Sequence, residues 1–228
     1  MKMVMICLVV SSMLLGSVLG RTPSQQPALT LKVAVVQTNI DDSNRKFFKS
    51  NAAMTVYKPR VQNGQWSSTR IKLLNGVDSI EAGWMVDPHM FTDDDAHLYA
   101  RFIAGQRVCV NHQCDGFVQV SKDVPLGIVP EKYSEIDVAN QVEWGGEIDD
   151  PGPTSPAPEM GCGRMAAYDT RYSTFFRKVT VDTDSSKNVE PQGTTKILNC
   201  PSLYHVLDEG YQGDYWGRLM YYGDYNLR

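Results

Sequence analysis

Two short stretches, related as mirror images, limit what this chain can fold into. The first, Val142–Ile148, reads V-E-W-G-G-E-I; it is short and carries paired glycines that would weaken a helix. Side chains of a strand alternate between its two faces, so one face carries Val142, Trp144, Gly146 and Ile148. The other face carries Glu143, Gly145 and Glu147. Glu147 therefore has a bare neighbour on its own face, Gly145, which predicts open space beside a carboxylate.

The second stretch, Ser79–Val86, repeats this arrangement in reverse order. It reads S-I-E-A-G-W-M-V, and alternation places Glu81 and Gly83 together on the face opposite Trp84. Each tryptophan is thus expected to pack in the core, beneath a strand that presents one carboxylate beside a glycine. Two such carboxylates could perform acid–base hydrolysis. Glu81 and Glu147 are the candidate catalytic residues, and Gly83 and Gly145 are candidates for the substrate cleft.

The rest of the chain predicts an all-β fold. Short β-rich runs alternate with turn signals such as Asn63-Gly64 and Asn75-Gly76, which favours an antiparallel sandwich or barrel. The expected strands are 31–37, 53–57, 67–74, 80–86, 97–103, 116–120, 142–148, 174–181, 193–198 and 216–222. Residues 131–140 are the one possible helical turn, and 149–158 form a proline-rich loop directly after Glu147.

The first twenty residues are expected to be a secretory signal peptide. Lys2 precedes an apolar run from Met3 to Leu15, and small or aliphatic residues lead to Gly20. A membrane anchor would need about 20 apolar residues. Residues 21–30 then read as a flexible lead-in, and 31–228 as one domain. We expect a secreted protein, outside the cell or in a vacuole or cell wall, with no membrane contact after cleavage. The net charge of −4 gives no electrostatic case for nucleic acid.

The cysteines fit this oxidising compartment. Removal of residues 1–20 leaves Cys109, Cys114, Cys162 and Cys200. Cys109 and Cys114 flank a short turn, so we predict a local disulfide between them. Cys162 and Cys200 could pair by elimination, but sequence does not show their geometry. Neither C-x-x-C nor paired histidines at ligand spacing occur, so we expect no metal and no cofactor.

Four motifs, in order, resemble the neprosin family of largely plant secreted proteins, which includes prolyl endopeptidases of the glutamic-peptidase type. They are 79–88 (SIEAGWMVDP), 109–120 (C-x4-C-DGFVQV), 142–148 (VEWGGEI) and 160–163 (MGCG). The resemblance runs from about Val33 to Tyr222. It implies an antiparallel β-sandwich with Glu81 and Glu147 as the catalytic pair, and Glu143 is a rival for the second role. The chain departs from the family pattern in three ways. Only a short lead-in stands in place of the activation region, central strands are missing near residues 127–131, and a late cysteine is absent.

The resemblance implies an endopeptidase that cleaves peptides after proline in acid, through a water activated by one glutamate while the other is protonated. We expect a monomer. Because one proton is shared between two close carboxylates, their pKa values should separate. One alternative is an inactive secreted β-sandwich that binds peptide or cell-wall material. Another is a two-carboxylate glycosidase, since a carboxylate pair alone does not choose between sugar and peptide.

Overall fold

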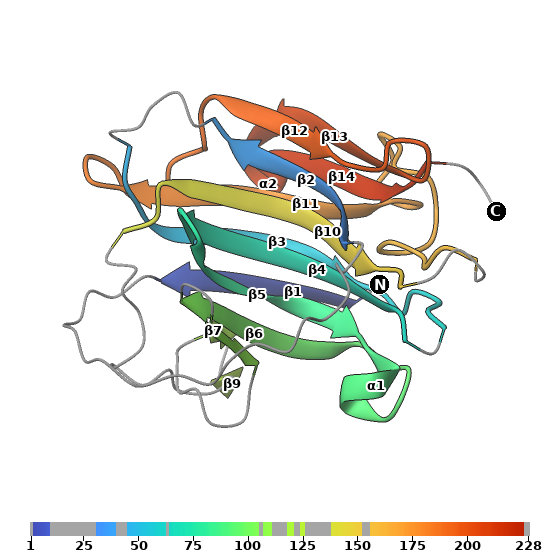
Figure 1. The fold of residues 1–228 in the computed structure, drawn as a ribbon. Coiled ribbons are helices and arrows are strands. Elements are labelled where there is room, and N and C mark those ends of the chain that lie inside the picture. The colour runs from blue at the N-terminus through green and yellow to red at the C-terminus, as the bar shows by residue number, and fades with distance from the viewer. Residues whose placement is uncertain are drawn as a thin grey trace.

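The fold is a sandwich of two antiparallel β-sheets, seen in a computed structural model (Figure 1). The structure describes residues 2–9, 31–39, 45–62, 64–104, 107–110, 118–120, 124–125, 138–151 and 156–225. In strand order, sheet A consists of β13 (Tyr204–Tyr211), β14 (Arg218–Asp224), β11 (Thr174–Thr183), β3 (Phe47–Val56), β1 (Lys2–Val9), β8 (Val118–Val120) and β9 (Val124–Pro125). Sheet B consists of β12 (Thr194–Leu198), β2 (Leu31–Thr38), β10 (Gln141–Asp149), β4 (Trp66–Asn75), β5 (Asp78–Val86), β6 (His97–Ala104) and β7 (Arg107–Val110). The predicted all-β sandwich is confirmed.

The core lies between the inner faces of the two sheets, and the two tryptophans bridge them. Trp84 and Trp144 project from sheet B and are 0% exposed. The Trp84 indole donates a 2.8 Å hydrogen bond to the Thr55 carbonyl, and the Trp144 indole donates a 2.9 Å bond to Ser50 Oγ. Both partners lie on β3 of sheet A. Each tryptophan therefore combines a large buried area with a satisfied N–H, which ties one sheet to the other.

Most predicted strands are present, and their ends differ by a few residues. The Asn75-Gly76 signal gives the β4–β5 hairpin, where Asn75 pairs with Asp78 and Gly76 has a φ of 61°. The predicted strand 216–222 begins later, at Arg218. Gly213–Trp216 forms the short helix α2 in its place, and Gly217 ends that helix at a φ of 59°. Strand β13 was not predicted, because its polar residues Asp208 and Glu209 follow no clean alternation.

The leader segment is where the structure differs most from the expectation. Residues 1–20 were expected to lie outside the fold, but Lys2–Val9 forms β1, paired along its length with β3 and also with β8. Apolar, β-branched residues suit a buried strand as well as a signal peptide, so the sequence pattern does not separate the two. Removal of this segment would leave β3 without its neighbour on that side and separate β8–β9 from the sheet.

The described helices are both one turn long. Helix α1 (Pro88–Phe91) follows β5 and is capped by Asp87, whose side chain accepts hydrogen bonds from the backbone of His89 and Met90. Neither helix is long and apolar enough to cross a membrane. Most of the predicted helical turn at 131–140, the region near 127–131 and the lead-in at 21–30 fall outside the described residues.

Candidate active site

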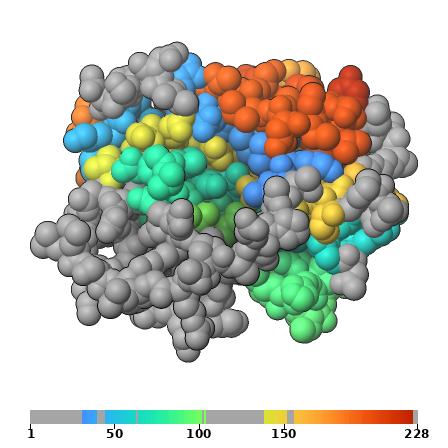
Figure 2. All heavy atoms as spheres, in the orientation of Figure 1, coloured from blue at the N-terminus to red at the C-terminus, as the bar shows by residue number. Residues whose placement is uncertain are grey.

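The candidate site lies on the outer face of sheet B, whose strands β12, β2, β10 and β4 lie side by side in Figure 2, and is centred on Arg70 of β4. Alternation places Ile71 and Leu73 in the core and turns Arg70 and Lys72 to the opposite face. In the register of the sheet, Arg70 stands between Gly145 on β10 and Gly83 on β5. One row along, Lys72 stands between Glu143 and Glu81, and β6 adds Arg101 beside Glu81.

The two glycines allow neighbouring strands to approach closely. A Cβ atom at Gly83 would lie 1.7 Å from the carbonyl oxygen of Thr69, and one at Gly145 would lie 2.2 Å from that of Ala34. Gly145 also has a φ of 155°, which disfavours a side chain. Open space was expected beside Gly83 and Gly145, but backbone atoms of the neighbouring strands fill the positions that their Cβ atoms would take. Their role in a substrate cleft stays a prediction.

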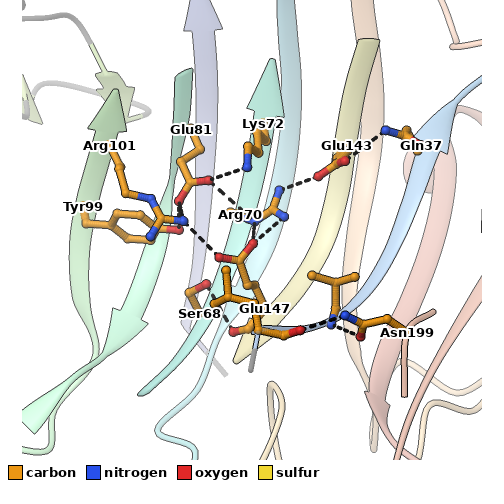
Figure 3. A network of polar contacts seen from close by, with 12 residues as sticks. Gln37, Ser68, Arg70, Lys72, Glu81, Tyr99, Arg101, Glu143, Glu147 and Asn199 are labelled. Carbon is orange, nitrogen blue, oxygen red and sulfur yellow. Dashed lines mark hydrogen bonds and ion pairs between the residues drawn. The ribbon is translucent and has the colours of Figure 1, made fainter. Parts of the chain in front are cut away.

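The two predicted catalytic glutamates come together on this face (Figure 3). They lie on β5 and β10, with β4 between them. Arg101 Nη2 lies 2.7 Å from Glu81 Oε1 and 2.9 Å from Glu147 Oε1, so one nitrogen bridges the two carboxylates. Glu81 is 0% exposed and Glu147 is 2% exposed. The mirrored sequence stretches thus produce one shared carboxylate site, and it is almost sealed from solvent.

Arg70 links Glu147 to the rival glutamate, Glu143. Its Nη2 lies 2.5 Å from Glu147 Oε2, its Nε donates to the same oxygen at 2.7 Å, and its Nη1 lies 2.8 Å from Glu143 Oε2. Glu143 also accepts a 3.0 Å hydrogen bond from Gln37. Glu143 therefore points away from Arg101 and holds the other side of Arg70, as Figure 3 shows.

Three carboxylates face three basic side chains here, and we call these six residues the carboxylate–arginine cluster: Glu81, Glu143, Glu147, Arg70, Lys72 and Arg101. Formal charges balance, which is the condition under which so many ions can be buried. Burial alone would raise the pKa of Glu147, but Arg70 and Arg101 outweigh burial and lower it to about 2. Glu147 is therefore ionised even in acid.

Glu81 is held differently. Tyr99 donates a 3.0 Å hydrogen bond to Glu81 Oε1, the oxygen that also contacts Arg101. Burial, and then the charge of Glu81, raise the pKa of Tyr99 well above its usual value, so Tyr99 stays a neutral donor. Glu81 Oε2 is buried and accepts no hydrogen bond from the described part of the chain; its nearest cations, Lys72 and Arg70, are 3.6 and 3.7 Å away.

Sequence reasoning missed the basic half of the cluster. The signal was present in the alternation of two predicted strands. Thr69–Leu73 places Arg70 and Lys72 on one face, and His97–Ile103 places Tyr99 and Arg101 on one face. A charged residue flanked on both sides by core residues is a candidate partner for a carboxylate on the next strand. That each cation would align with a glutamate depends on strand order and register.

The remaining site predictions involve cysteines and metals. Cys114 and the side chain of Cys109 lie outside what the structure describes, so their disulfide stays a prediction. Among the described residues Cys162 and Cys200 are free thiols, which argues against their pairing. No group of three or more histidine, cysteine, aspartate or glutamate side chains arranged to hold a metal occurs in the described part of the chain.

Comparison with known sequences gives one family. The sequence model of the family described as Neprosin matches residues 63–138 and 132–224. The two matched stretches overlap at residues 132–138, next to the region near 127–131 where strands are expected to be missing. They include both mirrored stretches and every member of the carboxylate–arginine cluster. No curated protein matches the chain.

Proposed function

The chain belongs to the neprosin family, which indicates a peptidase-type function, and from that premise we propose that it is a glutamic endopeptidase that cleaves after proline in acid. The observation that carries this proposal is the contact of Glu81 and Glu147 with the same nitrogen of Arg101. Glu147 is held by Arg70 and Arg101, which lower its pKa, whereas Glu81 contacts Tyr99 and Arg101. Two close carboxylates in unlike surroundings are what a general acid and a general base require.

In this proposal Glu147 is the base and Glu81 is the acid. Glu147 remains ionised in acid because Arg70 and Arg101 stabilise its charge, so it can take a proton from water as the water oxygen attacks the scissile carbonyl carbon. Glu81, protonated on Oε2, donates a hydrogen bond to the developing oxyanion. The proton that Glu147 took from water passes to the leaving nitrogen as the C–N bond breaks. No covalent enzyme intermediate forms, and no metal is required.

Replacement of each glutamate by glutamine tests the assignment. Glu81→Gln and Glu147→Gln keep the shape of the side chain and remove its ability to exchange a proton. Each should lower kcat/KM for a proline-containing peptide in acid by about 10²–10⁴-fold. The double variant should lose little more than either single variant, because residues that act as a unit are non-additive.

Glu143→Gln is the matched control on the same strand. Glu143 contacts Arg70 and Gln37 and does not reach Arg101, so this variant should keep most of the activity. An inactive Glu143→Gln beside an active Glu147→Gln would place the second catalytic role on Glu143. A polysaccharide incubated in parallel should release no sugar; release of sugar with no peptide cleavage would favour the glycosidase.

One observation favours a second candidate, an inactive secreted protein that binds peptide or cell-wall material. Glu81 and Glu147 are sealed from solvent and already occupied by arginines, which leaves the carboxylates little contact with a substrate. Wild-type protein that is folded but cleaves no peptide from neutral pH down to about pH 3 would select this candidate. Activity anywhere in that range rejects it.

Secretion is part of the proposal. It is supported by Lys2, the apolar run and Gly20, although Lys2–Val9 also fits as β1. N-terminal sequencing of protein recovered outside the cell should begin near Arg21. A protein that starts at Met1 would instead favour β1 as a permanent strand.

A further inference from the structure

Tyr99 on β6 is a buried side chain beside the carboxylate–arginine cluster, and the proposed mechanism gives it no role. It lies on the outward face of its strand, two positions from Arg101, and is 5% exposed. In the register of β5 with β6, Tyr99 stands opposite Gly83, and Arg101 stands opposite Glu81. Because Gly83 carries no side chain, the Tyr99 ring can lean diagonally toward Glu81, a distance that aromatic side chains span between neighbouring strands.

Tyr99 and Arg101 bind the same oxygen of Glu81 (Figure 3). The Tyr99 hydroxyl donates a 3.0 Å hydrogen bond to Glu81 Oε1, and Arg101 Nη2 lies 2.7 Å from that oxygen. A carboxylate oxygen offers about two acceptor sites, so these two donors occupy both. Glu81 Oε2, in contrast, is buried and accepts no hydrogen bond from the described part of the chain. The two oxygens of Glu81 are therefore unequal.

This inequality decides where a proton on Glu81 lies. A proton on Oε1 would turn an O–H donor toward the phenol or the guanidinium, and one of those two hydrogen bonds would be lost. A proton on Oε2 leaves both donors of Oε1 in place. When Glu81 is protonated, its proton therefore lies on Oε2, the oxygen that faces the developing oxyanion in the proposed mechanism.

Of the two donors on Oε1, Tyr99 is the one that acts through Glu81 without carrying charge. Arg101 is shared by both glutamates, since the same nitrogen also lies 2.9 Å from Glu147 Oε1. Burial, and then the charge of Glu81, raise the pKa of Tyr99 well above its usual value, so the phenol is a neutral donor in acid. Loss of its hydroxyl would free one acceptor site on Oε1 and leave the charge balance of the cluster unchanged.

We propose that Tyr99 is a positioning residue of the catalytic site, whose hydroxyl, together with Arg101, fills Glu81 Oε1 and keeps the proton of Glu81 on Oε2. Without that hydroxyl the proton can lie on either oxygen. A carboxyl group that is protonated on Oε1 presents no donor to the oxyanion, so fewer molecules are ready to react. The catalytic part of this inference rests on the proposed function, whereas the fixed orientation of the Glu81 carboxyl group does not.

Kinetics of Tyr99→Phe test the catalytic part. This variant keeps the ring and removes the hydroxyl. With a proline-containing peptide in acid it should lower kcat by about 10–100-fold, the effect of losing one hydrogen bond to a charged group. KM should stay within about 2-fold of wild type, because the hydroxyl acts on the acid and does not bind the substrate.

Tyr204→Phe is the matched control. Tyr204 is also buried, on β13 of sheet A, and its hydroxyl donates a 2.7 Å hydrogen bond to the Pro158 carbonyl. This variant removes a buried tyrosine hydroxyl away from the cluster, so kcat and KM should each stay within about 2-fold of wild type. Thermal unfolding of each variant, measured first, ensures that only folded proteins are compared.

Carbon-13 NMR tests the orientation of Glu81 without any cleavage. In a chain labelled at the side-chain carboxyl carbon of glutamate, the Glu81 signal is the one that Glu81→Gln lacks. It should move in Tyr99→Phe and stay in place in Tyr204→Phe. The reciprocal measurement needs no variant of Tyr99. With the label at the tyrosine Cζ atom, one tyrosine signal should move in Glu81→Gln and stay in place in Glu143→Gln.

The outcomes separate this inference from the proposed function. A fall in kcat at nearly constant KM, with a displaced Glu81 signal, supports the positioning role. A Glu81 signal that stays in place in Tyr99→Phe overturns it, whether or not the chain cleaves peptides. An unchanged kcat in Tyr99→Phe, or an equal fall in Tyr204→Phe, also overturns it. A wild-type chain that cleaves no peptide rejects the proposed function and the catalytic role of Tyr99 with it, whereas a displaced Glu81 signal still supports the fixed carboxyl group.

Discussion

The outer faces of the two sheets bury different kinds of side chain. The outer face of sheet B buries charge, with Glu81, Glu147 and Arg70 each at most 2% exposed. The outer face of sheet A buries a small apolar cluster around Phe175 and Tyr221 and exposes aromatic rings at its edge. Buried charge is stable only while every partner is present, whereas apolar and aromatic contacts depend little on any single partner. The two faces should therefore respond differently to substitution and to acid.

The buried charges also suit the role proposed for them, because fixed, paired charges in a site that excludes water can orient carboxylates.

The largest expected effect comes from removal of the central cation. Arg70→Met leaves three buried carboxylates facing two basic residues, which should lower the free energy of unfolding by about 3–5 kcal/mol. For a chain of this size that corresponds to a fall in Tm of about 10 °C, measured by thermal unfolding at neutral pH.

Arg171→Met is the matched control. Arg171 pairs with Asp169 at the surface, with its side chain 76% exposed, so its replacement should lower Tm far less than Arg70→Met does. Equal shifts for the two variants would show that the carboxylate–arginine cluster does not depend on charge balance.

A smaller effect is expected in the dependence of stability on pH. The folded state holds the pKa of Glu147 at about 2, below its ordinary value of 4.5. A depressed carboxyl pKa contributes stability above pH 4.5, and that stability is lost as the pH falls toward 2. Glu147→Gln lacks this contribution. The gap in unfolding free energy between wild type and variant should therefore narrow by on the order of 2 kcal/mol between neutral pH and about pH 3, measured by urea unfolding.

Tyr221→Phe on sheet A is the control for the pH dependence of Glu147→Gln. Burial, together with the charge of Glu209, raises the pKa of Tyr221 to about 12, so the phenol is neutral throughout the acid range. The difference in unfolding free energy between Tyr221→Phe and wild type should therefore change much less over the same pH range than the difference for Glu147→Gln does. If the difference in unfolding free energy from wild type narrows equally for both variants, the acid sensitivity belongs to the whole fold and not to Glu147.

Much of the fold could be predicted because it depends on local patterns. Two-residue alternation with β-branched and aromatic residues marked most of the described strands, and Asn75-Gly76 marked the β4–β5 hairpin. Local order also placed Glu81 and Glu147 on the outward faces of their strands, since each stands opposite a core tryptophan, and the resemblance to the neprosin family singled them out as a pair. Strand β13 and helix α2 were missed because tertiary contacts, rather than alternation, place their residues.

By itself, then, the sequence determined which residues face the core and which face outward, because the alternation of a strand is a property of its own backbone. Only the tertiary structure decided what those outward residues meet. The register β10–β4–β5–β6 aligns Arg70 with two glycines and Arg101 with Glu81, and a slip of one residue would turn each of them to the other face. Likewise, the sequence shows only that Lys2–Val9 is largely apolar. It becomes a strand of sheet A because β3 supplies partners for its backbone hydrogen bonds. Hydrogen bonds between distant strands carry that information, and no local pattern contains it.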